Sequence, residues 1–428
     1  MAKRVMAATL GCKVNLYDTR AVLQKFAEAG YEVVDFKDGG GPVDLCIVNT
    51  CCVTNLAERK SRQAIRRARA LGADAVAVMG CASQANPAQF HEAGADFVVG
   101  TDDRLLLFDE ICGGQKHTQQ NLDFGFVDKT DDRTRAFLKI QEGCDNFCSY
   151  CIVPYVRGAS RSRAFADVLS QAKHFEAAGY KEIVLSGIHA ASYGKDFEGE
   201  NCGLVDVLTA ICGLEGIERV RLSSADACVV TPQFLDFVAD NPKFCSHLHL
   251  SLQSGSDRIL GLMNRKYTAA GFAEAIYKLR AIRPEFSITT DVIAGFPGET
   301  DAEHRQTMAL LEKLGLTGLH VFPYAAKAKT AAAAMPGQID AKVKRQRAAE
   351  LAALDKRLKE AYCGHFVGQT KNVLVEELDR NGLFLGKTGN YISVCFEASA
   401  EVSSLVNEIV AVKLEAYEGG MMFGSMKY

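Results

Sequence analysis

Three cysteines in the run EGCDNFCSYCIVPYVRG have residue types and spacing suited to chemistry. Cys144, Cys148 and Cys151 follow the pattern C-x3-C-x2-C, and the aromatic Tyr150 directly precedes the last thiol. Three thiolates at this spacing can hold three corners of a cubane iron–sulfur cluster. The remaining iron then stays open and can bind and activate a substrate, whereas a fully ligated cluster mainly carries electrons.

A zinc site is the alternative for these thiols. Zinc usually takes four nitrogen or sulfur ligands from C-x2-4-C pairs, and no further Cys or His lies close by in the sequence. The motif therefore favours an iron–sulfur cluster over zinc.

The composition indicates a soluble globular protein. The chain has 428 residues, which predicts about three domains, and 48% of the residues are hydrophobic and 24% charged. The net charge of -3 means that nucleic acid could be bound only through local basic patches. No apolar run approaches the roughly 20 residues of a membrane span, and the start MAKRVMAATLGCKVN does not resemble a secretory signal.

Fifteen cysteines in a chain without a signal predict a cytoplasmic protein that uses thiols to ligate metal and not to form disulfides. We also expect a monomer. Some cysteines lie among apolar or loop residues and are expected to pack as small hydrophobes. These are Cys112, Cys202, Cys212, Cys228, Cys245, Cys363 and Cys395.

Residues 1–115 alternate between strand-like and helical patterns. RVMAATLG, DLCIVNTC and DAVAVMGC are short apolar runs, separated by helical segments such as TRAVLQKFAEAGY and ERKSRQAIRRARALG. This alternation predicts an α/β domain with a parallel sheet, in which a site lies at the carboxyl ends of the strands. Cys12, Cys51 and Cys81 each end one of the strands, so we expect a second three-cysteine cluster site at that edge.

Two more cysteines lie close to this predicted site. Cys46 falls inside a strand and is expected to pack in the core. Cys52 adjoins Cys51 and points elsewhere in an extended chain, so it is given no role. Spacing alone leaves an exchange between Cys51 and Cys52 open.

Residues 130–362 again alternate between strands and helices. The strand candidates are EIVLSGIHA, RVRLSSAD, HLHLSLQSGS, SITTDVIAGFPGE and GLHVFPY, and helical runs such as DVLSQAKHFEAAG lie between them. Repeated βα units predict a complete or incomplete (β/α) barrel, with function on the loops after the strands. The polar residues 116–134 before this region are interpreted as a linker.

The last part of the chain changes character. A long charged helix is predicted for residues 340–362, and short β runs such as FVGQTKNVLVEEL and GLFLGKTGNYISVCFE follow between 363 and 428. These runs predict a small β-barrel, a fold that can guide RNA. A barrel that serves only packing or oligomerisation is the alternative.

Three segments of the first domain, TLGCKVNLYD, VNTCCVTNLAERKSR and MGCASQ, resemble the cysteine motifs of the radical S-adenosylmethionine (SAM) methylthiotransferase family. The C-x3-C-x2-C run with its aromatic residue resembles the radical-SAM signature, and the C-terminal β runs resemble the RNA-binding barrel called TRAM. The resemblance covers essentially the whole chain and implies a partial, six-unit barrel in the centre. Cys52 is a departure from the family pattern, because a non-thiol residue is expected there.

This resemblance implies two [4Fe-4S] clusters with different tasks. The first would bind SAM and cleave it to a 5′-deoxyadenosyl radical, and its ligands are Cys144, Cys148 and Cys151. The second, an auxiliary cluster, would carry the sulfur to be transferred, and its ligands are Cys12, Cys51 and Cys81. One SAM would methylate that sulfur, and a second would supply the radical that takes a hydrogen from an unactivated carbon.

Strand-end loops of the central region are the candidates for contacts with SAM. Tyr150 is expected near the SAM adenine, although a core aromatic is the alternative. In the loop GFPGE, glycine lets the backbone approach a ligand closely, and HVFPY (320–324) ends the last strand. The candidate SAM-binding residues are Ser186, Gly187, Gln253, Ser254, Gly295 and Glu299.

Two groups of arginines predict contacts with tRNA phosphates. One group recurs at three- and four-residue steps on the helix after Cys51, and the other directly follows Cys151. Arginine pairs well with phosphate, although a solvated basic face is the alternative. The candidates are Arg59, Arg62, Arg66, Arg69, Arg157, Arg161 and Arg163.

Family branches act on threonylcarbamoyl-adenosine or isopentenyl-adenosine in tRNA, or on an aspartate of a ribosomal protein. SGIHAASYG, QSGSDRILGLMNRKYT and RGASRSR resemble the threonylcarbamoyl branch most. That branch implies methylthio transfer to C2 of N6-threonylcarbamoyladenosine next to the anticodon. The Gln-Asn pair of the isopentenyl branch is absent, while FPYAAKAKTAAAAMPGQ is richer in alanine than the usual polar loop.

Two other classes of protein stay open at this point. One is a non-catalytic iron–sulfur protein that binds RNA through its barrel, and it would form no 5′-deoxyadenosine. The other is a radical-SAM enzyme whose auxiliary cluster only passes electrons.

Overall fold

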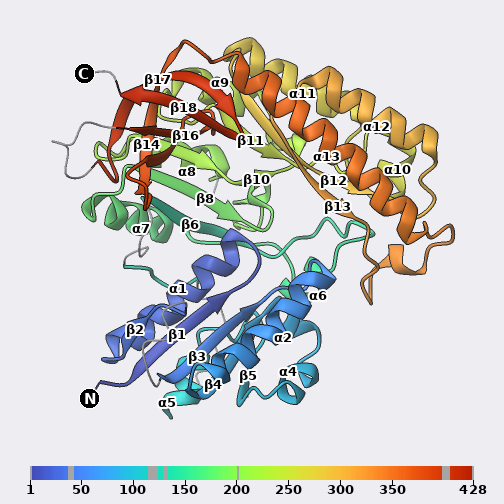
Figure 1. Ribbon diagram of the computed structural model, residues 1–428. Coiled ribbons are helices and arrows are strands. Elements are labelled where there is room, and N and C mark those ends of the chain that lie inside the picture. The colour runs from blue at the N-terminus through green and yellow to red at the C-terminus, as the bar shows by residue number, and fades with distance from the viewer. Residues whose placement is uncertain are drawn as a thin grey trace.

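The computed structural model describes residues 2–36, 43–113, 124–128, 134–199, 202–397 and 405–426. Most of the predicted linker at 116–134 lies outside these described residues. Figure 1 shows an N-terminal α/β domain below a larger central domain, with a small β-barrel at one side of the central domain. Within the described ranges, the helices are too short or too polar to cross a membrane.

The N-terminal domain is built on a parallel sheet with the strand order β2-β1-β3-β4-β5, which confirms the predicted parallel α/β fold. Its strands are β1 (Arg4–Thr9), β2 (Glu32–Val34), β3 (Val43–Thr50), β4 (Ala73–Gly80) and β5 (Phe97–Val98). Its helices are α1 (Lys13–Glu28), α2 (Asn55–Ala70), α3 (Cys81–Ala85), α4 (Ala88–Glu92) and α5 (Leu107–Cys112).

The central strands of this sheet are apolar on both faces because helices cover both. On one face, Ile47 of β3 packs in the same core cluster as Phe26 of α1. On the other face, Cys46 lies with Ile65 of α2 in a second apolar cluster. The two helices thus hold the strands so that their carboxyl ends form a single edge.

The central domain is a partial barrel of parallel strands in two sheets, β7-β6-β8-β9 and β10-β11-β12-β13. An isolated parallel bridge between Val220 and Phe244 links the two sheets. The strands are β6 (Arg135–Glu142), β7 (Arg161–Ser162), β8 (Glu182–Gly187), β9 (Arg219–Leu222), β10 (Ser224–Ala225), β11 (His247–Leu250), β12 (Ser287–Ala294) and β13 (Gly318–Pro323). Only the short β7 pairs in the antiparallel sense with its neighbour.

Helices cover the outer face of the partial barrel (Figure 1). They are α7 (Phe165–Ala177), α8 (Leu204–Cys212), α9 (Pro232–Asp240), α10 (Asp257–Leu262), α11 (Ala269–Ile282), α12 (Asp301–Leu314) and α13 (Ala341–Gly364). The short α6 (Val153–Arg157) packs instead on α3 of the N-terminal domain. Short 3-10 turns are η1 (Ala190–Ser192), η2 (Ala227–Val229) and η3 (Ala331–Ala334). The structure therefore confirms the predicted partial (β/α) barrel.

The C-terminal part of the chain forms a closed barrel of five strands in the order β14-β15-β16-β18-β17. β16 and β18 pair in the parallel sense, and the other neighbours are antiparallel. The strands are β14 (Thr370–Leu378), β15 (Phe384–Thr388), β16 (Ser393–Glu397), β17 (Ile409–Glu418) and β18 (Met421–Met426). This confirms the predicted C-terminal β-barrel.

The turn between β15 and β16 joins the small barrel to the central domain. Tyr391, at φ +71°, stacks on His247 with 4.4 Å between ring centroids. The Arg221 guanidinium lies over the same ring at 4.7 Å. This aromatic and cationic contact fixes the position of the C-terminal barrel against the strands of the central one.

Candidate functional site: two sets of cysteines and the arginines beside them

The N-terminal cysteines lie together at the carboxyl edge of the first sheet. Cys12 caps α1 after β1, Cys51 follows β3, and Cys81 begins α3 after β4. Close approach of the strand ends requires glycine at Gly80, which has φ +106° and where an added Cβ would lie 2.3 Å from Asn49 Oδ1. The sheet thus brings together the three thiols predicted to hold the auxiliary cluster.

Arg157, the last residue of α6, reaches across from the central domain to this edge. Its Nε donates to Cys81 Sγ at 3.1 Å, and its Nη2 donates to Asn15 Oδ1 at 2.5 Å. The side chain is 1% exposed. A hydrogen bond from the Cys52 thiol and the charge of Arg157 lower the pKa of Cys81 to about 6, against the effect of burial.

A buried ionic network anchors Arg157. Its Nη1 contacts Glu142 at 2.7 Å and Asp18 at 3.3 Å. Lys139 pairs with the same two carboxylates, at 2.5 and 2.6 Å, and Arg104 contacts Asp18 at 3.1 Å. Three cations thus face two carboxylates, and the surplus positive charge lies beside the thiols, where it can stabilise thiolates or an anionic cluster.

Cys51 and Cys52 face different surroundings. Cys51 lies against Gly11, where an added Cβ would lie 3.2 Å from Cys51 Sγ, and burial raises the pKa of Cys51 to about 11. Cys52 belongs to the apolar cluster that contains Ile65. Cys81 belongs to the same cluster and accepts a hydrogen bond from the Cys52 thiol, so the assignment of Cys51 as the third ligand stays a prediction.

The second set of cysteines lies on the loop between β6 and α6. Gly143, at φ +70°, starts the loop, where an added Cβ would lie 1.9 Å from Ala159 O. Cys144 N then donates to Gly158 O at 3.1 Å, and Cys151 N donates to Cys148 O at 2.9 Å. The turn therefore wraps back on itself and holds the three thiols on one short loop.

Arg265 contacts a thiol of this loop. Its Nη1 donates to Cys148 Sγ at 3.4 Å, its Nη2 to Ser251 O at 3.2 Å and its Nε to Tyr267 Oη at 2.8 Å. The fork of donors thereby ties the cysteine loop to the end of β11. Each set of cysteines thus has an arginine beside it, the buried Arg157 for one and the half-buried Arg265 for the other.

The predicted SAM-binding residues lie on three strand ends around the cysteine loop. Ser186 and Gly187 end β8, and the following His189 contacts Asn146 of the cysteine loop at 3.4 Å. The hydroxyl of Ser186 is already used, because Ser186 Oγ donates to Leu138 O at 3.3 Å. Contacts with a ligand at this strand end would therefore come from the backbone.

Gln253 and Ser254 follow β11 and are almost completely buried. Gln253 has φ +73°, its N donates to Asp291 O at 2.9 Å, and its carbonyl accepts from Ile293 N at 3.0 Å. Ser254 Oγ accepts from Ser256 N at 3.2 Å. This left-handed turn bonds the end of β11 to β12 in a fixed geometry.

The GFPGE loop after β12 is held from within. Gly295 N donates to Glu299 Oε2 at 2.9 Å, and Arg347 Nη1 contacts the same oxygen at 2.6 Å. Tyr150 packs in an apolar cluster with Phe296 and Ile293, which flank Gly295. The predicted adenine neighbour and the glycine loop are therefore side by side, whereas the Glu299 carboxylate is committed to Arg347.

The arginines of α2 lie on the outer side of the helix, because Ser61, Ala64, Ile65 and Ala68 form its buried side. Arg59 and Arg66 are exposed, and Arg62 is half-buried with its Nη1 on Gln89 Oε1 at 3.1 Å. Arg69 is exposed but paired with Asp96 at 2.5 Å. The predicted basic face therefore exists.

The arginines after Cys151 behave differently from that prediction. Arg157 and Arg163 are 1% and 6% exposed, and Arg163 Nη1 donates to the Tyr17 hydroxyl at 2.7 Å. Their guanidinium groups serve contacts inside the protein, so the prediction of RNA contacts is wrong for these two. Arg161 stays partly accessible and pairs with the exposed Asp102 at 2.8 Å.

Sequence reasoning missed several residues near the cysteines. Arg265 is separated from Cys148 by more than a hundred residues, and the His189–Asp226 pair, 2.9 Å apart, joins two strand-end loops. Spacing carries no signal for such contacts. Arg157 was singled out in the sequence as a basic residue six positions after Cys151, but its contact with Cys81 was not predicted.

A cleft of about 1120 Å³ lies between the three domains. Thr9 and Leu10, just before Cys12, line one end, and Lys387 and Ser393 of the C-terminal barrel line another. Arg135 at the start of β6 also lines it.

Family models match all three parts of the chain. They are the radical SAM superfamily at residues 138–311, the uncharacterized protein family UPF0004 at 4–100 and the TRAM domain at 365–427. The threonylcarbamoyladenosine tRNA methylthiotransferase MtaB of Bacillus subtilis is 40% identical, over 95% of this chain and 92% of the relative. The chain belongs to the radical-SAM methylthiotransferase family. As a radical-SAM methylthiotransferase it is a transferase of the tRNA-modifying kind, and its superfamily uses SAM with a [4Fe-4S] cluster.

Further relatives of this methylthiotransferase divide by their named substrate. The MtaB protein of Aquifex aeolicus is 34% identical, over 95% of this chain and the full length of the relative. The tRNA-2-methylthio-N(6)-dimethylallyladenosine synthase of Acetivibrio thermocellus is 33% identical, over 98% of this chain and 90% of the relative.

Among solved structures, the radical SAM methyltransferase TsrM of Kitasatospora setae, determined with tryptophan substrate and a SAM analog, aligns with a TM-score of 0.57. The alignment covers 78% of this methylthiotransferase and 75% of TsrM at 14% sequence identity. At that identity the likeness shows a shared fold alone.

Proposed function

We propose that the protein adds a methylthio group to C2 of N6-threonylcarbamoyladenosine next to the anticodon of tRNA. The observation that carries the proposal is the placement of two three-cysteine sets on facing domains, joined by Arg157, in a chain that is 40% identical to an MtaB protein over nearly its full length. Radical formation and sulfur delivery are separate tasks, and each would have its own cluster site.

The residues of both sets fit iron–sulfur clusters by the chemistry of their donors. Each set offers three thiols and no disulfide within the described residues, and each has an arginine within hydrogen-bond distance of a sulfur. Cys144, Cys148 and Cys151 would hold the SAM-binding [4Fe-4S] cluster. Cys12, Cys51 and Cys81 would hold an auxiliary [4Fe-4S] cluster.

When bound, these groups supply a 5′-deoxyadenosyl radical from SAM on one side and a methylated sulfur on the other. The protein's own part is to set the two close together and to exclude water. The packing of α6 on α3 and the Arg157 bond to Cys81 support the first of these tasks, because α6 directly continues the loop of the second cysteine set. The hydrogen bonds of Arg157 and Arg265 to Cys81 and Cys148 balance thiolate charge at each site.

Binding of SAM is proposed at the ends of β8, β11 and β12. The adenine would lie by Tyr150 and the backbone of Gly295, and the polar end of SAM would meet the backbone at Ser186 and Gly187 and at Gln253 and Ser254. Glu299 acts here by positioning, since its carboxylate holds Gly295 N and Arg347.

The tRNA would approach along α2 and the C-terminal TRAM barrel. The exposed guanidinium groups of Arg59, Arg66 and Arg69, the half-buried one of Arg62 and the partly accessible one of Arg161 are suited to phosphates. We further propose a cytoplasmic monomer, which a molar mass measured by light scattering in the presence and absence of tRNA would test.

A competition assay tests the substrate. Reconstituted protein receives SAM, a reductant and sulfide with equal amounts of three tRNAs, which carry threonylcarbamoyl-adenosine, isopentenyl-adenosine or unmodified adenosine. Nucleoside masses should show a methylthio gain mainly on threonylcarbamoyl-adenosine. A gain mainly on isopentenyl-adenosine would contradict the branch assignment, which matters because relatives named for dimethylallyladenosine are 33–34% identical to this chain.

A further inference from the structure

The inner face of the partial barrel is polar, unlike the packed interior of a complete barrel. In β11, Leu248 and Leu250 join the apolar core under the helices, so His247 and His249 face inward. In β12, Ile288 and Val292 pack outward in the same way. A strand lining of histidine, aspartate and threonine gives this inner face a surface suited to a polar group.

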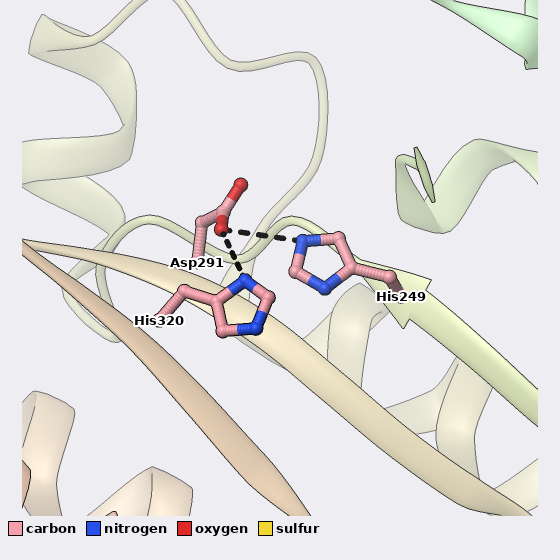
Figure 2. A group of neighbouring side chains, drawn as sticks. All are labelled: His249, Asp291 and His320. Atoms are coloured by element: carbon pink, nitrogen blue, oxygen red, sulfur yellow. Dashed lines mark ion pairs between the residues drawn. The ribbon is translucent and has the colours of Figure 1, made fainter. Parts of the chain in front are cut away.

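Three of these inward side chains form a compact group on the inner face of the barrel, shown in Figure 2. Both His249 and His320 point at one carboxylate oxygen of Asp291: His249 Nε2 lies 3.3 Å from Asp291 Oδ1, and His320 Nδ1 lies 3.4 Å from it. The two imidazole rings stack with centroids 4.9 Å apart. Asp291 and His320 are direct partners across β12 and β13.

Neighbouring hydroxyls fix the orientation of this His249–Asp291–His320 wall. His249 Nδ1 contacts Thr289 Oγ1 at 3.0 Å, and Ser251 Oγ donates to Asp291 Oδ2 at 3.3 Å. His249 is 10% exposed at its side chain, whereas His320 is 59% exposed. The wall therefore presents His320 to a ligand and keeps His249 and Asp291 behind it as positioning residues.

Lys13 reaches the same inner face from the N-terminal domain. It directly follows Cys12, and its Nζ lies 3.4 Å from Ser223 Oγ at the end of β9. Ser224, the next residue, pairs in register with His249, so Lys13 reaches the strand level of the wall. Among the described residues, Ser223 is its hydrogen-bond partner and it forms no ion pair with a carboxylate, so the remaining donors of this ammonium group can meet an anion.

The chemistry of the substrate defines which groups this inner face would have to bind. C2 of the base has to face the two cysteine sets, and the substituent on N6 projects away from C2. That substituent carries a urea, a hydroxyl and a free carboxylate at neutral pH. A buried or half-buried carboxylate needs a cation, and a hydroxyl needs a donor or acceptor fixed in place.

We propose that Lys13 binds the carboxylate of the threonylcarbamoyl group and that His320, held by Asp291, binds its urea or hydroxyl. The inference rests on the proposed function and adds the residues that read the substituent. Lys13 directly follows Cys12, a proposed ligand of the auxiliary cluster. The residue that binds the substituent is therefore adjacent in sequence to the cluster that carries the sulfur.

A two-by-two binding experiment tests the role of Lys13. Wild type and Lys13→Met, both reconstituted and supplied with SAM without reductant, are titrated with tRNA carrying threonylcarbamoyl-adenosine and with the same tRNA carrying unmodified adenosine. The wild type should prefer the modified tRNA, and Lys13→Met should lose about 10- to 100-fold of that preference, as expected for one charge-assisted hydrogen bond. Affinity for the unmodified tRNA should be unchanged.

Three further arms make the result specific. A tRNA whose threonyl carboxylate is converted to a methyl amide should bind wild type and Lys13→Met equally. Lys278→Met, which removes an exposed lysine of α11 paired with Glu274, should behave as wild type and is the matched control. His320→Ala should reduce the preference for the modified tRNA, and His320→Gln should restore part of it because Gln keeps hydrogen-bonding groups.

The proposal is overturned if Lys13→Met weakens both tRNAs equally, because Lys13 would then contact an RNA phosphate. It is also overturned if a stoichiometric divalent metal ion, found by elemental analysis in addition to cluster iron, disappears in His320→Ala, because the wall would then be a metal site. If the wild type itself shows no preference for the modified tRNA, the proposed function fails and not only this subsite. Iron and sulfide content of Lys13→Met must equal wild type for the comparison to count.

Discussion

Replacing Arg157 with methionine should destabilise the folded protein by about 3 kcal/mol and loosen the edge that carries Cys12, Cys51 and Cys81. Removing one member of a buried ionic group typically costs about 3–5 kcal/mol because a charge is left without its partner. Here Asp18 and Glu142 keep Lys139 and Arg104 as partners, so the lower end of the range applies. The thiol of Cys81 also loses its donor at 3.1 Å.

Amide hydrogen exchange of the reconstituted protein, read by mass spectrometry on peptides covering β4 and α6, measures this loss locally. Exchange in those peptides should speed up by about 100-fold or more, the equivalent of about 3 kcal/mol. Arg161→Met is the matched control, since its ion pair with Asp102 is exposed and contributes at most about 1 kcal/mol. Equal exchange in the two variants would refute the reasoning.

Three other outcomes are expected. Cys52→Ala should keep the iron of the second cluster while Cys51→Ala loses about half the total, as measured by iron and sulfide content; the reverse pattern would exchange the two ligands. Arg265→Met should slow 5′-deoxyadenosine formation about tenfold or more, because a charge-assisted bond to Cys148 is lost; an unchanged rate would contradict that role. Burial, together with the charges of Arg221 and Lys13, holds the pKa of His247 well below its usual range. At low pH this histidine is therefore protonated in the unfolded chain and neutral in the folded chain, so the folded state loses stability as the pH falls below about 6.5. His247→Phe keeps the ring stack on Tyr391 and should lose less melting temperature between pH 8 and pH 5.5 than wild type; an identical slope would contradict it.

The fold class of each domain followed from local patterns that a single sequence carries well. Apolar runs such as DLCIVNTC become β3 because both faces are covered by helices, and the cysteines at the strand ends then share one edge by geometry alone. The Gly and Asn turns after residue 363 likewise mark a small barrel without any knowledge of its pairing.

The contacts between domains could not be predicted in the same way. Arg157 and Arg163 look like surface arginines in sequence, and only the docking of α6 on α3 buries the first against Asp18 and Glu142. The same is true of Lys13 and Tyr391, which contact Ser223 and His247 of a different domain. Periodicity reports burial within an element, whereas these contacts depend on how folded domains meet.

The most direct test of the account is to separate the tasks of the two cysteine sets. Wild type, Cys12→Ala and Cys144→Ala are incubated anaerobically with SAM, a reductant, sulfide and tRNA carrying threonylcarbamoyl-adenosine, and both 5′-deoxyadenosine and the methylthio nucleoside are quantified. Wild type should form both products, Cys12→Ala should form 5′-deoxyadenosine alone, and Cys144→Ala should form neither. A methylthio nucleoside produced by Cys12→Ala would contradict the account, because sulfur delivery would then not depend on the N-terminal thiols.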